Sequence, residues 1–238
     1  MKRAVIYHDT AAGLLQDRLL QQNGSITLVV CSTKKQFLEQ LIPSISVNQS
    51  VQATALGERG DAEELSENVP PHPLLDPTLQ LIATSKATEL AFCPTIDTLR
   101  AYVSNFAAPD QGKTSPRASL LILDLILLHH ATSEFSVQGL MRSLASAVEA
   151  AARNHVDLQL CECKDVHDLS HPDRGPRLWE AQVALLSGSV RLRGEDAGWS
   201  GRMVSVRSIA GRWFEFEKKK APQDEGVIEG EAMLGRQR

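Results

Sequence analysis

The segment from Ser119 to Leu128 constrains the fold of this chain more than any other feature. Every residue in it is apolar except Ser119 and Asp124. A strand that helices cover on both faces is typically an unbroken apolar run, whereas a strand with one solvated face alternates. The run also falls well short of the ~20 apolar residues that a membrane helix needs. The sequence therefore predicts a buried strand at the centre of a mostly parallel sheet, with no membrane span.

Other apolar segments alternate with helical patterns on both sides of this run. Strand-like segments cover residues 2–7, 26–31, 89–93 and 156–161. The segments between them carry apolar residues at helical spacing. Thr10 is a candidate N-cap, and Ser32 or Thr33 is another. Strands that alternate with helices favour parallel pairing through right-handed crossovers. We therefore expect an α/β fold.

The end of the chain changes character. Residues 183–193 and 202–217 are rich in β-formers, so we expect terminal antiparallel strands with a last turn at Ala210 and Gly211. Residues 218–238 are polar and have little to bury, which predicts a disordered tail.

The chain is predicted to form one domain over residues 1–217. Its 238 residues are 42% hydrophobic, enough for one sizeable core. Polar, proline-containing segments at 44–73 and 107–118 are expected to be loops. The four cysteines all lie in strand-like segments, which indicates reduced, buried thiols. Only four apolar residues follow Arg3, too few for a signal peptide, so we expect an intracellular protein.

Two groups of residues carry a resemblance to a known family. The apolar strand from Leu120 to Leu123 ends in Asp124, and residues 201–207 and 212–216 follow near the chain end. Together with the βα order, they resemble the RecA-like ATPase core over residues 3–217. The resemblance implies a RecA-like parallel sheet flanked by helices. In that family the Asp at the end of this strand helps to hold Mg²⁺ beside the phosphates.

The phosphate-binding loop that the family needs is missing. Such a loop follows the first strand, and its glycines and lysine grip the phosphates. Residues 9–13 read Asp-Thr-Ala-Ala-Gly, without a lysine or a glycine pair. We therefore predict a non-catalytic protein without a cofactor, in which Asp124 is a vestigial Walker B-like residue.

Two histidine-containing groups are further candidates. Cys161, Cys163, His167 and His171 are zinc-type ligands, but two thiols on one strand face are also ordinary core residues. We therefore predict no metal and keep this set as a weak candidate site. His129 and His130 follow the apolar run, where α/β proteins often bind ligands, and the alternative is a pair that simply leaves the sheet.

Basic residues accumulate near the chain end, although the net charge is −4. The segment from His171 to Lys220 contains ten basic residues and six acidic ones. A mobile surface with several cationic groups suits phosphate contacts, and the alternative is a solvated face. Trp199 and Trp213 flank this region and are candidate partner-interface residues. The candidate DNA-binding residues are Arg191, Arg193, Arg202, Arg207, Arg212, Lys218, Lys219 and Lys220.

RecA-like relatives without the phosphate loop imply two functions. The recombinase-paralog subunits of the Shu complex are similar in plan, which implies a nuclear scaffold for a protein partner that also contacts single-stranded or forked DNA. The accessory subunits of Elongator are the alternative, which implies tRNA modification and a cytoplasmic location. Another pseudo-NTPase scaffold is a third option.

Overall fold

A computed structural model describes residues 1–21, 24–56, 72–108, 118–165, 174–185 and 203–217. The predicted disordered tail, residues 218–238, lies outside the described residues. No helix in the described part of the chain is long and apolar enough to cross a membrane.

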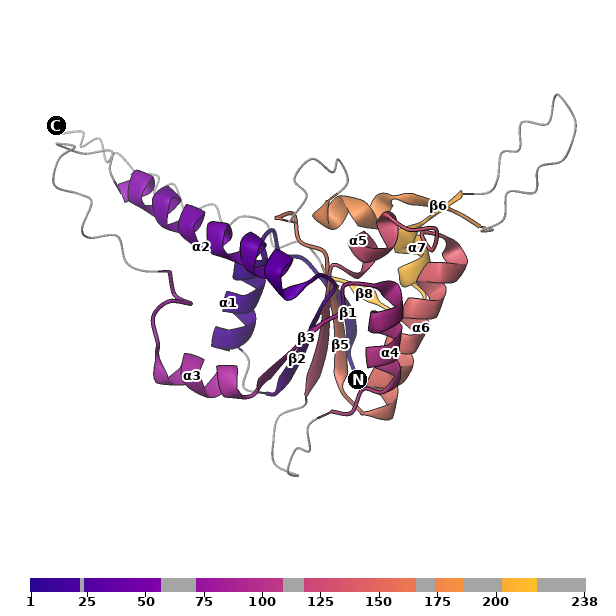
Figure 1. The fold of residues 1–238 in the computed structure, drawn as a ribbon, viewed down its shortest axis with the longest axis horizontal. Helices are drawn as coiled ribbons and strands as arrows, with labels where there is room; N and C mark the ends of the chain where they lie inside the picture. Colours follow the sequence, from indigo (N-terminus) through magenta and orange to yellow (C-terminus); the bar gives the residue numbers. More distant parts are fainter. Residues whose placement is uncertain (22–23, 57–71, 109–117, 166–173, 186–202, 218–238) are drawn as a thin grey trace, which may run out of the picture.

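A six-stranded, all-parallel sheet forms the centre of the molecule (Figure 1). Its strand order is β3-β2-β4-β5-β1-β8, so β4 lies between β2 and β5 as the apolar run predicts. All five residues of β4 are buried. The strands are β1 (Arg3–Ile6), β2 (Ile26–Val30), β3 (Thr88–Phe92), β4 (Ser119–Leu123), β5 (Asp157–Cys161) and β8 (Glu215–Phe216).

Helices cover both faces of this sheet (Figure 1). The connections from β1 to β3 progress toward one edge, and those from β3 onward progress toward the other. Because the crossovers are right-handed, this reversal moves the helices from one face to the other. One face carries α1 (Ala11–Gln21), α2 (Lys34–Leu56) and α3 (Leu79–Lys86). The other carries α4 (Ile96–Ser104), α5 (Leu125–His130), α6 (Val137–Arg153) and α7 (Val206–Ala210). The α/β fold class is therefore confirmed.

The predicted N-caps begin their helices. Thr10 Oγ1 accepts a hydrogen bond from the amide of Gly13 at 3.0 Å at the start of α1. Thr33 and Gln36 form a reciprocal capping box at the start of α2, with distances of 3.0 and 3.2 Å. Each cap satisfies an amide that has no partner within the helix.

Helix α2 corrects the expected loop at 44–73. The helix passes through Pro43 and ends at Leu56, so the first part of that segment is helical. An interior proline removes a backbone donor and crowds the carbonyl four residues earlier, which usually kinks or breaks a helix, but α2 continues on both sides of Pro43. Ser44 Oγ donates to the carbonyl of Leu41 at 2.9 Å in the turn around the proline. Residues 57–71 lie outside the described part, as do residues 109–117 of the other expected loop.

The apolar run is also shorter as a strand than the sequence suggests. Strand β4 ends at Leu123, and residues 125–130 form the helix α5. Asp124 makes the turn between them with φ 60° and ψ 37°, the left-handed region. An apolar strand and a buried helix cannot be separated by hydrophobicity alone.

The chain end is partly as predicted. Strands β6 (Gln182–Ala184) and β7 (Met203–Ser205) pair antiparallel in a small separate sheet. The expected final hairpin with a turn at Ala210 and Gly211 is wrong, because residues 206–210 form α7 and β8 pairs parallel to β1. The chain runs from β5 to β8 through β6, β7 and α7, and a long crossover of this kind joins strands that run parallel.

Candidate functional site

The turn between β1 and α1 is the position of the phosphate loop in the resemblance described above. The amide of Ala11, the first residue of α1, donates to both oxygens of Asp165, each at 3.0 Å. Asp165 follows β5, the strand beside β1. Helix N-termini bind anions because their free amides and the helix dipole favour negative charge. Here the chain's own carboxylate occupies that position.

Two further contacts hold this carboxylate and its turn. Gln40 Nε2 on α2 donates to Asp165 Oδ1 at 3.2 Å. Lys164 Nζ pairs with Asp9 Oδ1 at 2.8 Å, and the amide of Lys164 donates to the carbonyl of Asp9 at 2.9 Å. Burial raises the pKa of Asp165, and its hydrogen bonds, first that from Ala11, partly offset the increase.

A hollow of about 810 Å³ lies over this turn. Its lining includes Arg174, Arg177 and Lys164, which are cationic, together with Asp9 and Asp165. A phosphate group entering this hollow would meet the Asp165 carboxylate in place of free helix amides. The geometry therefore opposes the binding of a triphosphate in the usual mode.

Asp124, which the sequence predicts to be a vestigial Walker B-like residue, directly follows β4, the strand beside β5. Its side chain is buried, and the residue is only 5% exposed. Asp124 Oδ1 accepts a hydrogen bond from the amide of Cys163 at 3.0 Å. Burial raises the pKa of Asp124 to about 7, the Cys163 amide opposes that rise, and the charge of Asp165 adds to it. A carboxyl group with this pKa is partly protonated at neutral pH.

Glu162 is a second buried carboxyl group, which sequence reasoning missed. It is 1% exposed, and its oxygens accept from the amides of Ile126 at 2.7 Å and Leu127 at 3.2 Å. Glu162, the residue after β5, thereby satisfies two free amides at the start of α5. Burial first, and the nearby Asp124 second, raise its pKa well above the usual value. The sequence did contain a signal for this group, since Glu162 directly follows an apolar strand.

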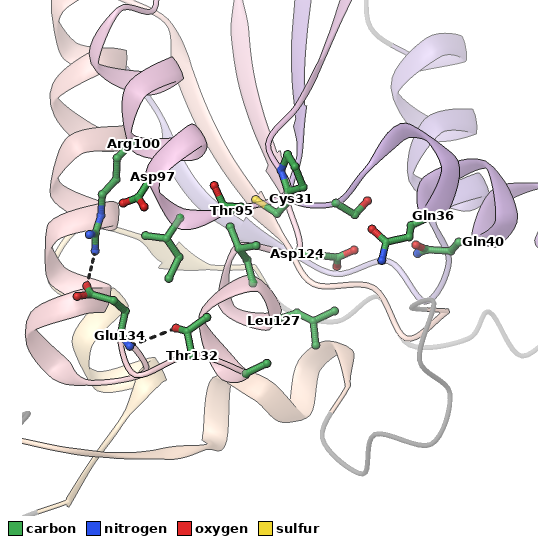
Figure 2. Close-up of a pocket in the computed structure, with 15 residues that line it drawn as sticks. Cys31, Gln36, Gln40, Thr95, Asp97, Arg100, Asp124, Leu127, Thr132 and Glu134 are labelled. Atoms are coloured by element: carbon green, nitrogen blue, oxygen red, sulfur yellow. Dashed lines mark hydrogen bonds and ion pairs between the residues drawn. The ribbon is translucent and has the colours of Figure 1, made fainter.

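A cleft of about 700 Å³ opens beside Asp124 at the carboxyl ends of β2, β3 and β4 (Figure 2). We call it the α2–α4 cleft, since residues at the start of both helices line it. Adjacent strands whose connections lead to opposite faces leave such crevices in open α/β sheets. Figure 2 shows Asp124, Gln36 and Gln40 pointing toward one another across it. Its lining also includes Cys31, Thr95, Asp97, Arg100, Leu127, Thr132 and Glu134.

A hydrogen-bonded network forms one wall of the α2–α4 cleft. Arg100 donates to Glu134 Oε2 at 2.9 Å, to the carbonyl of Gly139 at 3.0 Å and to Ser143 Oγ at 3.0 Å. Arg100 lowers the pKa of Glu134, first through this hydrogen bond. The guanidinium of Arg100 is therefore held by α6 and the loop before it.

His129 belongs to the same network. Its Nδ1 lies 3.2 Å from the carbonyl of Glu134, and its Nε2 lies 3.0 Å from Ser143 Oγ. A carbonyl only accepts, so Nδ1 carries the proton and the hydroxyl of Ser143 donates to Nε2 in the neutral ring. Burial lowers the pKa of His129 to about 4. The pair with His130 ends α5 and does not leave a strand, and His129 is a neutral structural residue.

The cysteine–histidine group is only half described. Cys161 and Cys163 are buried, with Sγ atoms 3.9 Å apart, and both are free thiols. The hydrogen bond between Cys163 and Cys161, and then burial, raise the pKa of Cys163 well above the usual value. His167 and His171 lie outside the described residues. Within the described ranges, no cluster of three or more metal-ligand side chains occurs.

The candidate DNA-binding residues fall mostly outside the described part of the chain. Arg207 and Arg212 are described, and Arg212 is exposed. Arg207 pairs with Glu180 at 3.1 Å and lies 4.4 Å from the ring centre of Phe216. Trp213 packs against the core while remaining partly exposed. The remaining candidates, Arg191, Arg193, Trp199, Arg202, Lys218, Lys219 and Lys220, lie outside the described residues.

Comparisons with known proteins assign this chain to no family, so the protein is described by its fold and site alone. The chain matches no family model, no curated protein and no solved structure. The architecture defines an α/β protein with a parallel sheet and an internally capped first helix.

Proposed function

We propose that the protein is a non-catalytic, RecA-like scaffold subunit of an accessory complex for homologous recombination and DNA repair, similar to the subunits of the Shu complex. It docks a protein partner and contacts single-stranded or forked DNA in the nucleus. The observation that carries the non-catalytic part is the Asp165 carboxylate on the amide of Ala11. A pseudo-enzyme of this kind acts through assembly.

Exposed apolar side chains on α3 and β3 support the docking role. Leu79 is 87% exposed and Leu90 is 52% exposed, and α3 has no buried residue. Strand β3 is an edge of the main sheet. Exposed large apolar side chains on an edge strand and on a helix are typical of a protein interface.

The docking role is tested by Leu79→Glu. A tagged wild-type chain and the variant are purified from the native organism, and recombination factors in each complex are quantified. We expect Leu79→Glu to lose at least about tenfold of its partner, since one buried interface leucine contributes a few kcal/mol. The control is Leu185→Glu, an exposed leucine beside β6. Equal recovery of the partner with both variants would contradict the assignment of this surface.

DNA binding is tested by fluorescence anisotropy with single-stranded DNA, forked DNA and tRNA over a salt series. We expect forked DNA to bind best and the affinity to fall with salt. The double variant Arg191→Ala with Arg193→Ala is expected to reduce the salt slope by about 1 to 2, one counterion for each lost phosphate contact. Lys34→Ala with Lys35→Ala, an exposed pair at the start of α2, is the matched control. A preference for tRNA would favour the Elongator-type function, and no binding to any nucleic acid at low salt would overturn this part of the proposal.

A further inference from the structure

The α2–α4 cleft contains hydrogen-bond acceptors that the protein itself does not use. Among the described residues, the Asp124 carboxyl accepts one hydrogen bond, at Oδ1, which leaves Oδ2 as an acceptor on the cleft lining although the residue is only 5% exposed. Gln40 uses its Nε2 on Asp165, which leaves its Oε1 as a second acceptor. Figure 2 shows both side chains directed into the same space. Acceptors on the lining of a cleft can bind a donor that a ligand brings into it.

The charges around this space do not balance. Arg100 is the cationic residue of the lining, and Glu134, Gly139 and Ser143 already engage it. Once the pair of Arg100 and Glu134 is set aside, the carboxyl groups of Asp97 and Asp124 remain. The cleft therefore favours positive charge.

Apolar side chains complete the lining. Ile96 begins α4, and Leu127 and Leu128 come from α5. A volume of about 700 Å³ lies within the range of small-molecule sites, which combine an apolar lining with a few placed polar groups. The cleft thus combines free acceptors, excess negative charge and an apolar lining. A ligand that suits all of these carries a cationic donor group at one end and an aliphatic stem at the other.

We propose that the α2–α4 cleft binds a small organic cation, an amine or guanidine on an aliphatic stem. Its charged group donates to Asp124 and to Gln40, and its stem packs against Leu127 and Ile96. This inference is independent of the scaffold function, because none of these residues belongs to the DNA or docking surfaces proposed above.

Matched probes test the proposal by isothermal titration calorimetry on the full chain. The probes are n-butylguanidinium, n-pentylammonium, the neutral isostere n-butylurea and the anion pentanoate. We expect both cations to bind at least about tenfold tighter than butylurea, the ratio that a charge-assisted hydrogen bond supplies. Pentanoate should not bind. Equal affinity for butylguanidinium and butylurea would overturn the proposal.

Variants locate the binding. Asp124→Asn keeps the acceptor for the Cys163 amide but removes the charge, and should weaken butylguanidinium binding at least about tenfold. Asp97→Asn, at an exposed position, should weaken it about two- to fivefold because solvent screens that charge. Glu149→Gln, an exposed residue on α6 outside the lining, should bind as the wild type does. Thermal unfolding of each variant separates lost binding from lost folding. Binding that survives both aspartate substitutions would place the cation elsewhere and overturn the assignment.

Discussion

Two polar positions on the carboxyl edge of one sheet differ in how their charges are satisfied. At the β1–α1 turn, the amide of Ala11 donates to the Asp165 carboxylate, and Lys164 pairs with Asp9. At the α2–α4 cleft, the Asp124 carboxyl keeps an unused acceptor beside an open volume. Open volume adjoins both positions, so the two differ in whether the protein's own residues already satisfy the charged group there.

The largest expected effect concerns Asp124. Its pKa is about 7 in the folded state against 3.8 unperturbed, so the folded state binds the proton more tightly. Stability therefore falls as pH rises from about 4 through 7, and Asp124→Asn should be more stable than the wild type at pH 8 by up to about 4 kcal/mol. Urea unfolding at pH 5 and pH 8 measures the difference, with Asp97→Asn as the exposed control. A variant that is less stable at pH 8 would contradict an uncompensated carboxyl group in the cleft.

Two glycines provide the next test. A Cβ on Gly139 would overlap the backbone carbonyl of Glu134, which also lies against His129 Nδ1. Gly139→Ala should cost about 3 kcal/mol, because the cleft wall must move. A Cβ on Gly13, at the β1–α1 turn, would lie 3.1 Å from the side-chain atom Thr10 Oγ1. Gly13→Ala should stay within about 1 kcal/mol of the wild type, since the gain in helix propensity offsets that contact. Equal costs in denaturant unfolding would show that the wall is not rigid.

The smallest effect concerns Asp165. Asp165→Ala removes both acceptors from the amide of Ala11 and should cost about 1 to 2 kcal/mol, the usual effect of losing a helix cap. Asp165→Asn keeps one oxygen and should cost less than half as much. Chemical unfolding at pH 7 measures both variants. If alanine and asparagine are equally tolerated, the carboxylate is not the cap that balances the turn.

The sequence predicts the parts of this molecule that depend on local pattern. The apolar run identifies β4 as the sheet centre, and Thr10 and Thr33 begin the helices expected of them. Pro43 does not end α2, although proline usually kinks or breaks a helix interior.

The decisive site contacts join residues that are distant in the chain. Asp165 meets Ala11 across 154 positions, and Glu162 meets Ile126 across 36. The spacing of apolar residues in the sequence cannot predict such pairs. They form because the sheet places β1 and β4 on either side of β5. Residues 9–13 show from sequence alone that the first strand is followed by no glycine pair and no lysine, whereas the contact of the Asp165 carboxylate with the Ala11 amide could not be read from sequence.

Asp165 already occupies the N-terminus of α1 through the amide of Ala11. NMR of the Ala11 and Gly13 amides during titration with ATP and Mg²⁺, alongside calorimetry, tests it most directly. We expect no saturable shift of either amide and no binding heat at millimolar nucleotide. A saturable shift of both amides that accompanies stoichiometric nucleotide binding would contradict it, because the phosphate would then have displaced the carboxylate.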